Sequence, residues 1–539
     1  MELSLTSSSA LVLLLPFLPL LCFWLYLRHD PKKQPHAHGL KPYPVLGTLP
    51  HFIKNQDRFL EWSTDILKRD APRHTMSFKV LGLTGGVITA NPANVEHILK
   101  TNFGNYPKGE LTVSMIEDFL GHGIFNSDGD QWLWQRKAAS YEFSKRSLRS
   151  FVVDAVRSEV VGRLLPMLQR AERDGRAVDV QDVLERFAFD NICRVAFDDD
   201  PACLAEEESV AATERSAEFM RAFNDAQTAV TARFMAPVKS TWRVKRFLNM
   251  EPERRMREAL RTIHGYADRI VRERRERGED AGEDFLSRFV AAGEHSDEGL
   301  RDVVTNFLLA GRDTTSSALT WFFWLVSTRP DVEAKIVREI RTVRSASSSP
   351  DDPETSRTFS FDELREMHYL HAAITESMRL YPPVALDTHS CRDDDFLPDG
   401  TFVGKGWLMS YSAYAMARVE EIWGEDCEEF RPERWLGEDG MFRPESPFKY
   451  PVFHAGPRMC LGKEMAYIQM KSIVACVFDK FRFRFLGGED TPGLVLSITL
   501  RMKGGLPMQE SEFLQWKDDG GQQLTRDDKV WRKPPVSLF

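Results

Sequence analysis

"PVFHAGPRMCLGKE", residues 451–464, places a single cysteine, Cys460, among glycines and basic side chains. The chain has seven cysteines in 539 residues, widely spaced and with no C-x-x-C pair, which argues against a zinc site and against a disulfide framework. A nucleophilic cysteine needs an oriented histidine, and the sequence offers His454 no evident orienting group. Packing and iron ligation therefore remain as the two interpretations of Cys460.

The residues around Cys460 favour iron ligation. They follow the pattern F-x-x-G-x-R-x-C-x-G, formed by Phe453, Gly456, Arg458, Cys460 and Gly462. A thiolate on a haem iron needs nearby backbone N–H groups, and glycines allow the backbone to approach closely. An aromatic ring can shield the sulfur, and an arginine two residues away can pair with a haem propionate. The apolar-periodic stretch after residue 462 predicts a helix whose N-terminal dipole stabilises the thiolate.

This stretch resembles the signature of the cytochrome P-450 haem-thiolate monooxygenases. The resemblance implies a mainly α fold with a minor β part, with haem b bound through Cys460 as axial ligand of the iron. Phe453 and Arg458 would then contact the cofactor. It further implies that dioxygen is a substrate and that electrons come from NADPH through a cytochrome reductase.

Four further segments match the family in order. In "AGRDTT" (310–315), the resemblance implies that Asp313 and Thr314 deliver protons during dioxygen activation; the alternative is a solvated charge and a core hydroxyl. In "GDQWLWQRK", Trp132 and Arg136 lie at i,i+4 and would contact the haem propionates; the alternative is a core tryptophan and an exposed arginine.

The other two segments carry charges for which the family has a structural role. "ESMR" contains Glu376 and Arg379 at i,i+3, on one helix face, and "FRPERW" contains Arg434. The resemblance implies that these three side chains interlock beneath the haem; a common surface ion pair is the alternative.

Composition and periodicity indicate one large, mostly helical domain. Hydrophobic residues make up 42% of the chain, and the net charge of −9, without a basic stripe, argues against nucleic-acid binding. Long amphipathic stretches predict helices at 151–170, 250–276, 299–328 and 361–380. "GVITANPANVEHILK" predicts a strand, a turn and a helix start, and short strands are expected near 400–410 and 481–500.

The N-terminal segment predicts a membrane anchor. Residues 10–27 are 18 uncharged apolar residues, long enough for a helix of about 27 Å, and Arg28, Lys32 and Lys33 follow them. A cleaved signal peptide lacks support, because no basic n-region or small-residue cleavage site is present. The positive flank predicts an anchor in the endoplasmic reticulum membrane with a cytosolic body. The expected domains are an anchor at 1–30, a Pro-containing connector at 31–50, the haem domain at 51–507 and a poorly ordered polar tail at 508–539.

A finer resemblance concerns the substrate. Stretches such as "TNFGNYPKGE", "FAFDNICRVAF" and "ESMRLYPPVALDT" are similar to the plant branch of fatty-acid ω-hydroxylases and jasmonoyl–amino acid hydroxylases, over roughly residues 40–508. The branch more often has a lysine at His389, and its chains usually stop before the terminal tail. Fatty-acid hydroxylation at or near the ω carbon is the expected activity, and ω-hydroxylation of a jasmonoyl conjugate is the alternative.

Three residues are candidate substrate contacts: Lys108, Phe307 and Val384. Lys108 would pair with the substrate carboxylate far from the iron, or else be a solvated loop charge or a haem-side ion pair.

Two alternatives belong to other functional classes. A haem-thiolate hydroperoxide isomerase or dehydratase needs no reductase, but such enzymes tend to lack the Asp–Thr pair seen at Asp313 and Thr314. A haem sensor would show no NADPH-supported turnover.

Overall fold

The computed structural model describes residues 40–43, 46–80, 84–141, 153–205, 210–236, 238, 240–277, 285–291, 296–347, 358–488 and 490–512. The anchor expected at 10–27 lies outside these residues, as do parts of the connector and most of the tail. Within the described residues, no helix combines the length and the apolar character that crossing a bilayer requires.

Helices dominate the fold, as expected. The helices longer than seven residues are α4 (Phe59–Arg69), α6 (Gly109–Leu120), α7 (Gly129–Ser140), α10 (Leu165–Arg173), α11 (Val180–Phe197), α12 (Val210–Met235), α14 (Glu253–Arg277), α16 (Asp297–Leu308), α17 (Thr314–Ser327), α18 (Pro330–Ser347), α20 (His368–Leu380) and α23 (Lys463–Phe478). Shorter ones are α3 (Leu49–Lys54), α5 (Pro92–Glu96), α9 (Val153–Glu159), α13 (Thr241–Phe247), α15 (Phe285–Ala291), α19 (Phe361–Glu366), α21 (Ala413–Met416) and α22 (Glu420–Trp423). Three π-helical segments join or extend them: η5 (His97–Thr101), η8 (Val160–Leu164) and η10 (Leu309–Asp313).

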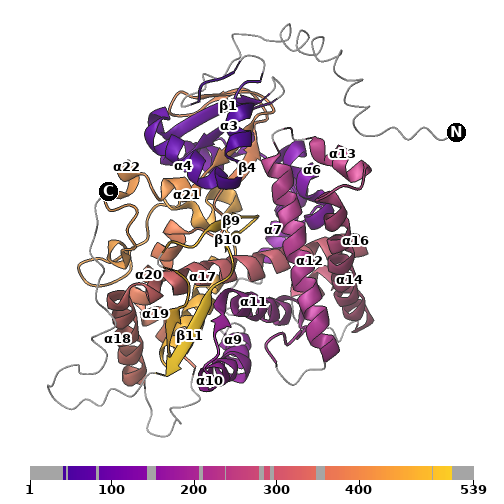
Figure 1. The fold of residues 1–539 in the computed structure, drawn as a ribbon. Helices are drawn as coiled ribbons and strands as arrows, with labels where there is room; N and C mark the ends of the chain where they lie inside the picture. The colour runs from indigo at the N-terminus through magenta and orange to yellow at the C-terminus, as the bar shows by residue number, and fades with distance from the viewer. Residues whose placement is uncertain are drawn as a thin grey trace.

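The β part is small. One sheet has the order β1 (Thr75–Val80), β2 (Thr84–Thr89), β7 (Leu408–Tyr411) and β4 (Asp387–Ser390), with β2 and β7 parallel and the other pairs antiparallel. This sheet and α3 and α4 lie at the top of Figure 1, above the helical body. The remaining strands form one three-stranded and two two-stranded sheets: β3 (Val178–Asp179), β11 (Pro507–Glu512) and β8 (Phe481–Phe485); β9 (Leu494–Leu496) and β10 (Leu500–Met502); β5 (Asp395–Phe396) and β6 (Phe402–Val403).

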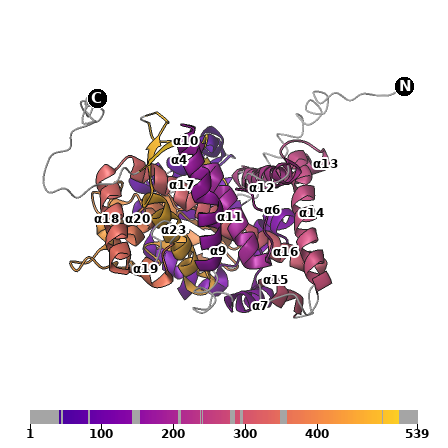
Figure 2. The same cartoon turned by 90° about the horizontal axis from the view of Figure 1, so that it is seen from below.

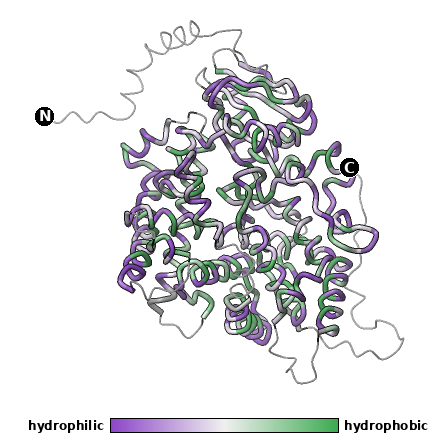
Figure 3. The backbone as a smooth tube through the Cα atoms, turned by 180° about the vertical axis from the view of Figure 1, so that it is seen from behind, coloured by the Kyte–Doolittle hydropathy of each residue, from purple (hydrophilic) through white to green (hydrophobic). Residues whose placement is uncertain are grey.

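Helix α17 forms the centre of the molecule. Its sequence, "TTSSALTWFFWLVS", carries no charge, and buried residues lie on every side of it, most of the Ser and Thr side chains of its first turns included. Trp321 is completely buried and stacks on Tyr381 with ring centroids 4.2 Å apart. Figure 2 shows α17, α11 and α23 running between the α18–α20 group on one side and α12, α14 and α16 on the other. Hydrophilic and hydrophobic residues alternate along the outer helices in Figure 3, as their amphipathic patterns predict.

The structure corrects two expectations. Met508–Glu512, which the sequence assigned to the polar tail, continue β11 and pair with β8, so the folded domain extends beyond residue 507. The 26-residue helix α12 was not anticipated, because its mixed small and charged residues give only a weak apolar period. Helices occupy all four predicted stretches, although those at 151–170 and 299–328 contain the π-helical segments η8 and η10, and the one at 361–380 is divided between α19 and α20.

Candidate active site

The loop before α23 holds Cys460 in a fixed turn. The Cys460 N–H donates to the Phe453 carbonyl at 2.8 Å and closes this loop. Gly456 has a φ of +64°, and a Cβ there would overlap the Leu99 carbonyl oxygen. Glycine is therefore required at position 456 by its approach to the segment at Leu99, rather than by an approach to the sulfur as the sequence interpretation assumed.

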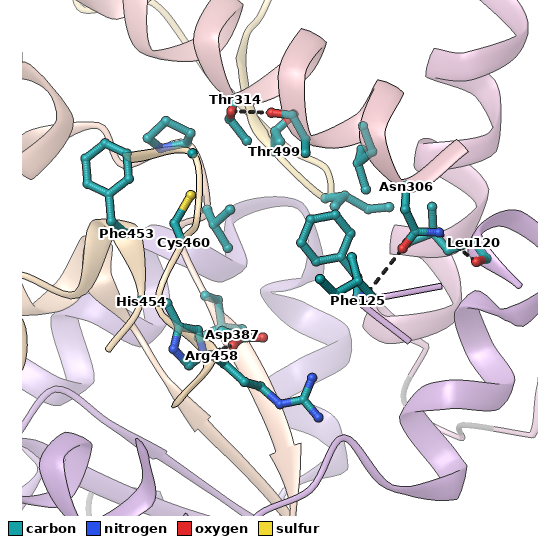
Figure 4. Close-up of a pocket in the computed structure, with 18 of the residues that line it drawn as sticks. Leu120, Phe125, Asn306, Thr314, Asp387, Phe453, His454, Arg458, Cys460 and Thr499 are labelled. Carbon is teal, nitrogen blue, oxygen red and sulfur yellow. Dashed lines mark hydrogen bonds and ion pairs between the residues drawn. The ribbon is translucent and has the colours of Figure 1, made fainter. Parts of the chain in front are cut away.

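The Cys460 side chain faces a large internal cavity. The cavity measures about 910 Å³, and Cys460 lies on its wall with Phe453 (Figure 4). Among the described cysteines, Cys460 is exposed, Cys203 is half-buried and the rest are buried. The side chain of Cys460 is open to the internal cavity, yet the protein that surrounds the cavity desolvates the thiol and so raises its pKa, whereas the Gly462 N–H and the charges of Arg136 and Lys463 act in the opposite direction.

Positive side chains gather on the same wall as Cys460. Arg458 lies 4.5 Å over the Trp132 ring and forms a 2.6 Å ion pair with Asp128, while Arg136 donates to the Met459 carbonyl at 2.7 Å. All three predicted residues, Trp132, Arg136 and Arg458, line the cavity. The Arg458 Nε is buried without a hydrogen-bond partner, so this guanidinium keeps an unused donor at the cavity.

A half-buried carboxylate that the sequence interpretation missed, Asp387, lies beside these cations. The Asp387 side chain lies 2.8 Å from Lys108 Nζ, 3.3 Å from His389 Nε2 and 3.2 Å from His454 Nε2. Burial alone would raise the pKa of Asp387, but Lys108 and the two imidazoles hold it well below its usual range. Burial lowers the pKa of His389 to about 4, with a further contribution from Lys108.

This group also has the composition of a metal site, since one ligand atom from each of Asp387, His389 and His454 lies within 4.8 Å of the others. The Lys108 ammonium already supplies the positive charge that a cation would bring, and His389 Nδ1 is engaged by the Tyr106 carbonyl at 2.9 Å. The cluster is therefore neutralised by the protein itself.

The opposite wall of the cavity is formed where α16 passes into α17. The π-helical segment η10 widens the helix here, and Ala310, Gly311 and Thr314 line the cavity. The Thr314 hydroxyl donates to the Ala310 carbonyl at 2.7 Å (Figure 4). A Cβ at Gly311 would collide with Ile192 of α11, so glycine allows α11 to pack closely against this segment.

Asp313 points away from the cavity, unlike its neighbour Thr314. Its carboxylate accepts a hydrogen bond of 3.0 Å from Gln227 of α12 and lies 2.9 Å from Arg312 Nη1. Burial raises the pKa of Asp313 to about 6, against the opposing charge of Arg312. The sequence pairs Asp313 with Thr314, but in the structure the two side chains face different surroundings.

The predicted network of Glu376, Arg379 and Arg434 is present and buried. Arg379 makes two hydrogen bonds to Glu376, of 2.8 and 2.9 Å, and Arg434 Nε adds a third of 2.9 Å. The Trp435 indole N–H and the Arg431 backbone N–H also donate to this carboxylate. These side chains do not line the cavity, which agrees with a structural rather than a catalytic role.

The three candidate substrate contacts, Lys108, Phe307 and Val384, all lie on the cavity wall. Phe307 packs on Phe285 with ring centroids 3.8 Å apart. The buried Asn306, which the sequence did not single out, bonds to the Phe125 N–H and the Leu120 carbonyl (Figure 4). It ties α16 to the segment after α6 and so fixes that part of the cavity wall.

The haem implied by the sequence resemblance fits this cavity. A thiol faces the space from one wall, cationic side chains with an unused donor lie beside it, and a widened helix forms the other wall. The volume of about 910 Å³ falls within the range of cofactor and ligand sites. A thiolate is a ligand for haem iron, and arginines suit its two propionates.

Comparisons with known proteins agree with this geometry. The family model described as Cytochrome P450 matches residues 37–503. Cytochrome P450 CYP94D108 of Paris polyphylla is 47% identical over 485 residues, which cover 90% of this chain and 93% of that protein. Cytochrome P450 94B1 of Arabidopsis thaliana is 44% identical over 478 residues (87% and 90%), and Cytochrome P450 94A1 of Vicia sativa is 42% identical over 482 residues (87% and 89%).

Proposed function

The chain belongs to the cytochrome P450 family, and from that premise we propose that it hydroxylates fatty acids at or near the ω carbon. It is a haem-dependent monooxygenase whose electrons come from NADPH through a reductase. The observation that carries the proposal is the apolar cavity between Cys460 and Thr314, in which a long chain can reach the cysteine wall. Bound haem b supplies the redox chemistry of dioxygen activation.

The protein's own residues would hold the cofactor from several sides. Cys460 would bind the haem iron through its sulfur, and the Gly462 N–H would help to keep it as a thiolate. Arg136, Arg458 and Trp132 lie where they can engage the haem carboxylates, and Phe453 lies beside the loop that carries the cysteine. The low pKa of Asp387 adds a fixed negative charge, which keeps Lys108 and the neighbouring imidazoles in place.

Thr314, on the other wall of the cavity, and Asp313, which lies behind that wall, would deliver protons. The Thr314 hydroxyl lines the cavity and could donate a hydrogen bond into it once it leaves the Ala310 carbonyl. Asp313, with a pKa of about 6, can both bind and release a proton near neutral pH. Because its carboxyl faces α12, proton delivery requires a rotation of the side chain or an intervening water.

The cavity wall supports an elongated, mostly apolar substrate. Aromatic and aliphatic residues from distant parts of the chain line it, among them Phe52, Phe78, Leu120, Phe125, Phe234, Phe307, Val384 and Ile498. A fatty acid of 16 carbons extends about 20 Å, so its carboxylate would lie far from Cys460 when the methyl end is near it. Lys108 is engaged by Asp387, and a substrate carboxylate would have to compete for it.

Membrane association is the remaining part of the proposal. The apolar segment at 10–27 would anchor the protein in the endoplasmic reticulum membrane with the described domain in the cytosol. Helix α13 supports contact with lipid, because Val244, Phe247 and Leu248 are exposed on one face beside basic residues.

Product analysis tests the proposed function. The full-length protein in microsomes with a reductase and NADPH is given saturated fatty acids of different lengths and jasmonoyl-isoleucine, and products are identified by mass spectrometry. Terminal or near-terminal hydroxy fatty acids are expected. Oxidation of jasmonoyl-isoleucine alone would show that the substrate is the jasmonoyl conjugate and not a fatty acid. Conversion of a hydroperoxide without NADPH would show that the protein is not a monooxygenase.

A further inference from the structure

Asp313 is held by a buried network centred on α11 and α12. Arg312, which is completely buried, contacts the Asp313 carboxylate and donates to Glu185 Oε2 at 2.9 Å and to Asn224 Oδ1 at 3.1 Å. Glu185 also accepts a 2.6 Å bond from Arg501. Apart from the bond to Asn224, these contacts join two cations, Arg312 and Arg501, to two carboxylates, so the network carries its own charge balance around Asp313.

Gln227 is the uncharged member that touches Asp313 directly. Its Nε2 donates to Asp313 Oδ2 at 3.0 Å, and its side chain is almost fully buried. Its Oε1 is buried without a hydrogen-bond partner. An amide oxygen that is buried without a partner destabilises the folded protein. A methionine of similar shape would therefore be the more stable residue at position 227, unless the hydrogen bond from the Gln227 amide to Asp313 is needed.

The same helix also forms part of the cavity wall. Thr231, Phe234 and Met235 of α12 line the cavity, one to two turns beyond Gln227 on the same helix face. Gln227 therefore links the Asp313 carboxyl to the wall that a substrate would contact.

We propose that Gln227 is a positioning residue for proton delivery, which holds the Asp313 carboxyl against α12 and favours its ionised form. The inference rests on the proposed function, because it concerns the same route of proton delivery. Gln227 itself is not part of the evidence for that function.

The direction of the effect follows from the contacts. A hydrogen bond donated to a carboxylate lowers its pKa, so loss of the Gln227 N–H raises the pKa of Asp313 from about 6. The charged groups that act on Asp313 are Arg312 on its own segment, Glu185 on α11 and Arg501 on β10. Replacement of Gln227 by an apolar residue leaves all three unchanged.

The test is an infrared titration of the haem-loaded, full-length protein. The carboxylic acid C=O band of Asp313 is assigned by its absence in Asp313→Asn and followed with pH in wild type and Gln227→Met. The midpoint should move upward by about one pH unit in Gln227→Met. Thr228→Ala is the matched control, because Thr228 neighbours Gln227 on α12 but its hydroxyl bonds to the Asn224 carbonyl. An unchanged midpoint in Gln227→Met would overturn the proposal.

A second readout separates this proposal from the proposed function. With dodecanoic acid as substrate, the ratio of product to NADPH consumed should shift along the pH axis in Gln227→Met by the same amount as the infrared midpoint. A pH profile identical to wild type would show that Gln227 has no role in proton delivery. If no fatty acid is oxidised at all, the proposed function fails, while the infrared titration still decides whether Gln227 positions Asp313.

Discussion

Replacement of Cys460 by alanine should abolish haem ligation while the fold persists. No other soft anionic donor lies on the cavity wall among the described residues, since the remaining described cysteines do not line it. The reduced, carbon monoxide-bound wild type should show the red-shifted Soret band of a thiolate ligand, and Cys460→Ala should lack it. Cys203→Ala, a change outside the cavity, should keep the band. A wild-type spectrum typical of histidine-ligated haem would contradict the ligand assignment.

Thr314→Ala should separate NADPH consumption from product formation. The Thr314 hydroxyl faces the cavity, so its loss disturbs proton delivery but leaves the Cys460 ligand in place. Product per NADPH should fall several-fold, hydrogen peroxide should rise, and the haem content should stay at the wild-type level. Ser316→Ala is a suitable control, because this hydroxyl also bonds to a carbonyl one turn earlier but does not line the cavity. Equal coupling in Thr314→Ala and Ser316→Ala would exclude a proton role for Thr314.

Lys108→Met tests whether Lys108 pairs with Asp387 on the cofactor side of the cavity or with the substrate carboxylate. Removal of the ammonium leaves the half-buried Asp387 carboxylate without its 2.8 Å partner, so the pKa of Asp387 should rise and the neighbouring Arg136 and Arg458 should be held less firmly. If Lys108 serves the cofactor side, haem retention falls and KM changes equally for a fatty acid and its methyl ester. A rise in KM for the free acid alone, with kcat unchanged, would instead assign Lys108 to the substrate carboxylate.

At the scale of elements, the junction between α20 and the segment at Arg431–Trp435 depends on one carboxylate. Glu376 accepts bonds from Arg379, Arg434 and the Trp435 indole. Glu376→Gln removes the charge and leaves buried guanidinium groups uncompensated, which should lower the free energy of unfolding by about 3–5 kcal/mol. Urea unfolding followed by the haem absorbance measures the change. Glu433→Gln, at an exposed pair with Lys335, should cost at most about 1 kcal/mol. Similar losses in the two variants would refute a special role for the buried network.

The sequence predicted those elements in which the local pattern of apolar and polar residues agrees with their burial in the fold. The run after Gly462 predicted α23, and the amphipathic stretch at 299–328 predicted the helical segment that contains α16 and α17. The π-helical turn of η10 was not predicted, because it spans five residues, too few for a period to be recognised in the sequence. The strand at Pro507–Glu512 was missed because its sequence is polar and resembles a disordered tail. It forms a strand because its backbone pairs with β8, which lies outside the local sequence pattern.

At the scale of the whole molecule, the sequence identified the residues that belong to one motif but not the contacts between motifs. Trp132 and Arg458 were both chosen, yet their stacking joins segments more than 300 residues apart. Asp387 escaped attention because its role depends on Lys108 and His454, which no spacing rule connects to it. The unusual His389 was noticed, and its neighbourhood was the available signal for this cluster.

The outer surface of the molecule leads to the last prediction, which concerns membrane contact without the N-terminal segment. Phe247 of α13 is 88% exposed, and Val244 and Leu248 lie on the same helix face. Basic side chains of α13, including Lys245, favour an anionic lipid surface. A variant that lacks residues 1–29 should therefore retain haem and still bind anionic phospholipid vesicles.

Phe247→Glu in that truncated protein should weaken vesicle binding about tenfold, because a buried phenylalanine contributes about 1.5–3 kcal/mol. Phe396→Glu is the matched control, since Phe396 is also strongly exposed but lies on β5. Cosedimentation with vesicles at several lipid concentrations gives the partition coefficients. Equal losses in the two variants would indicate that exposed phenylalanines bind lipid wherever they lie, and no loss in Phe247→Glu would remove α13 from the membrane surface.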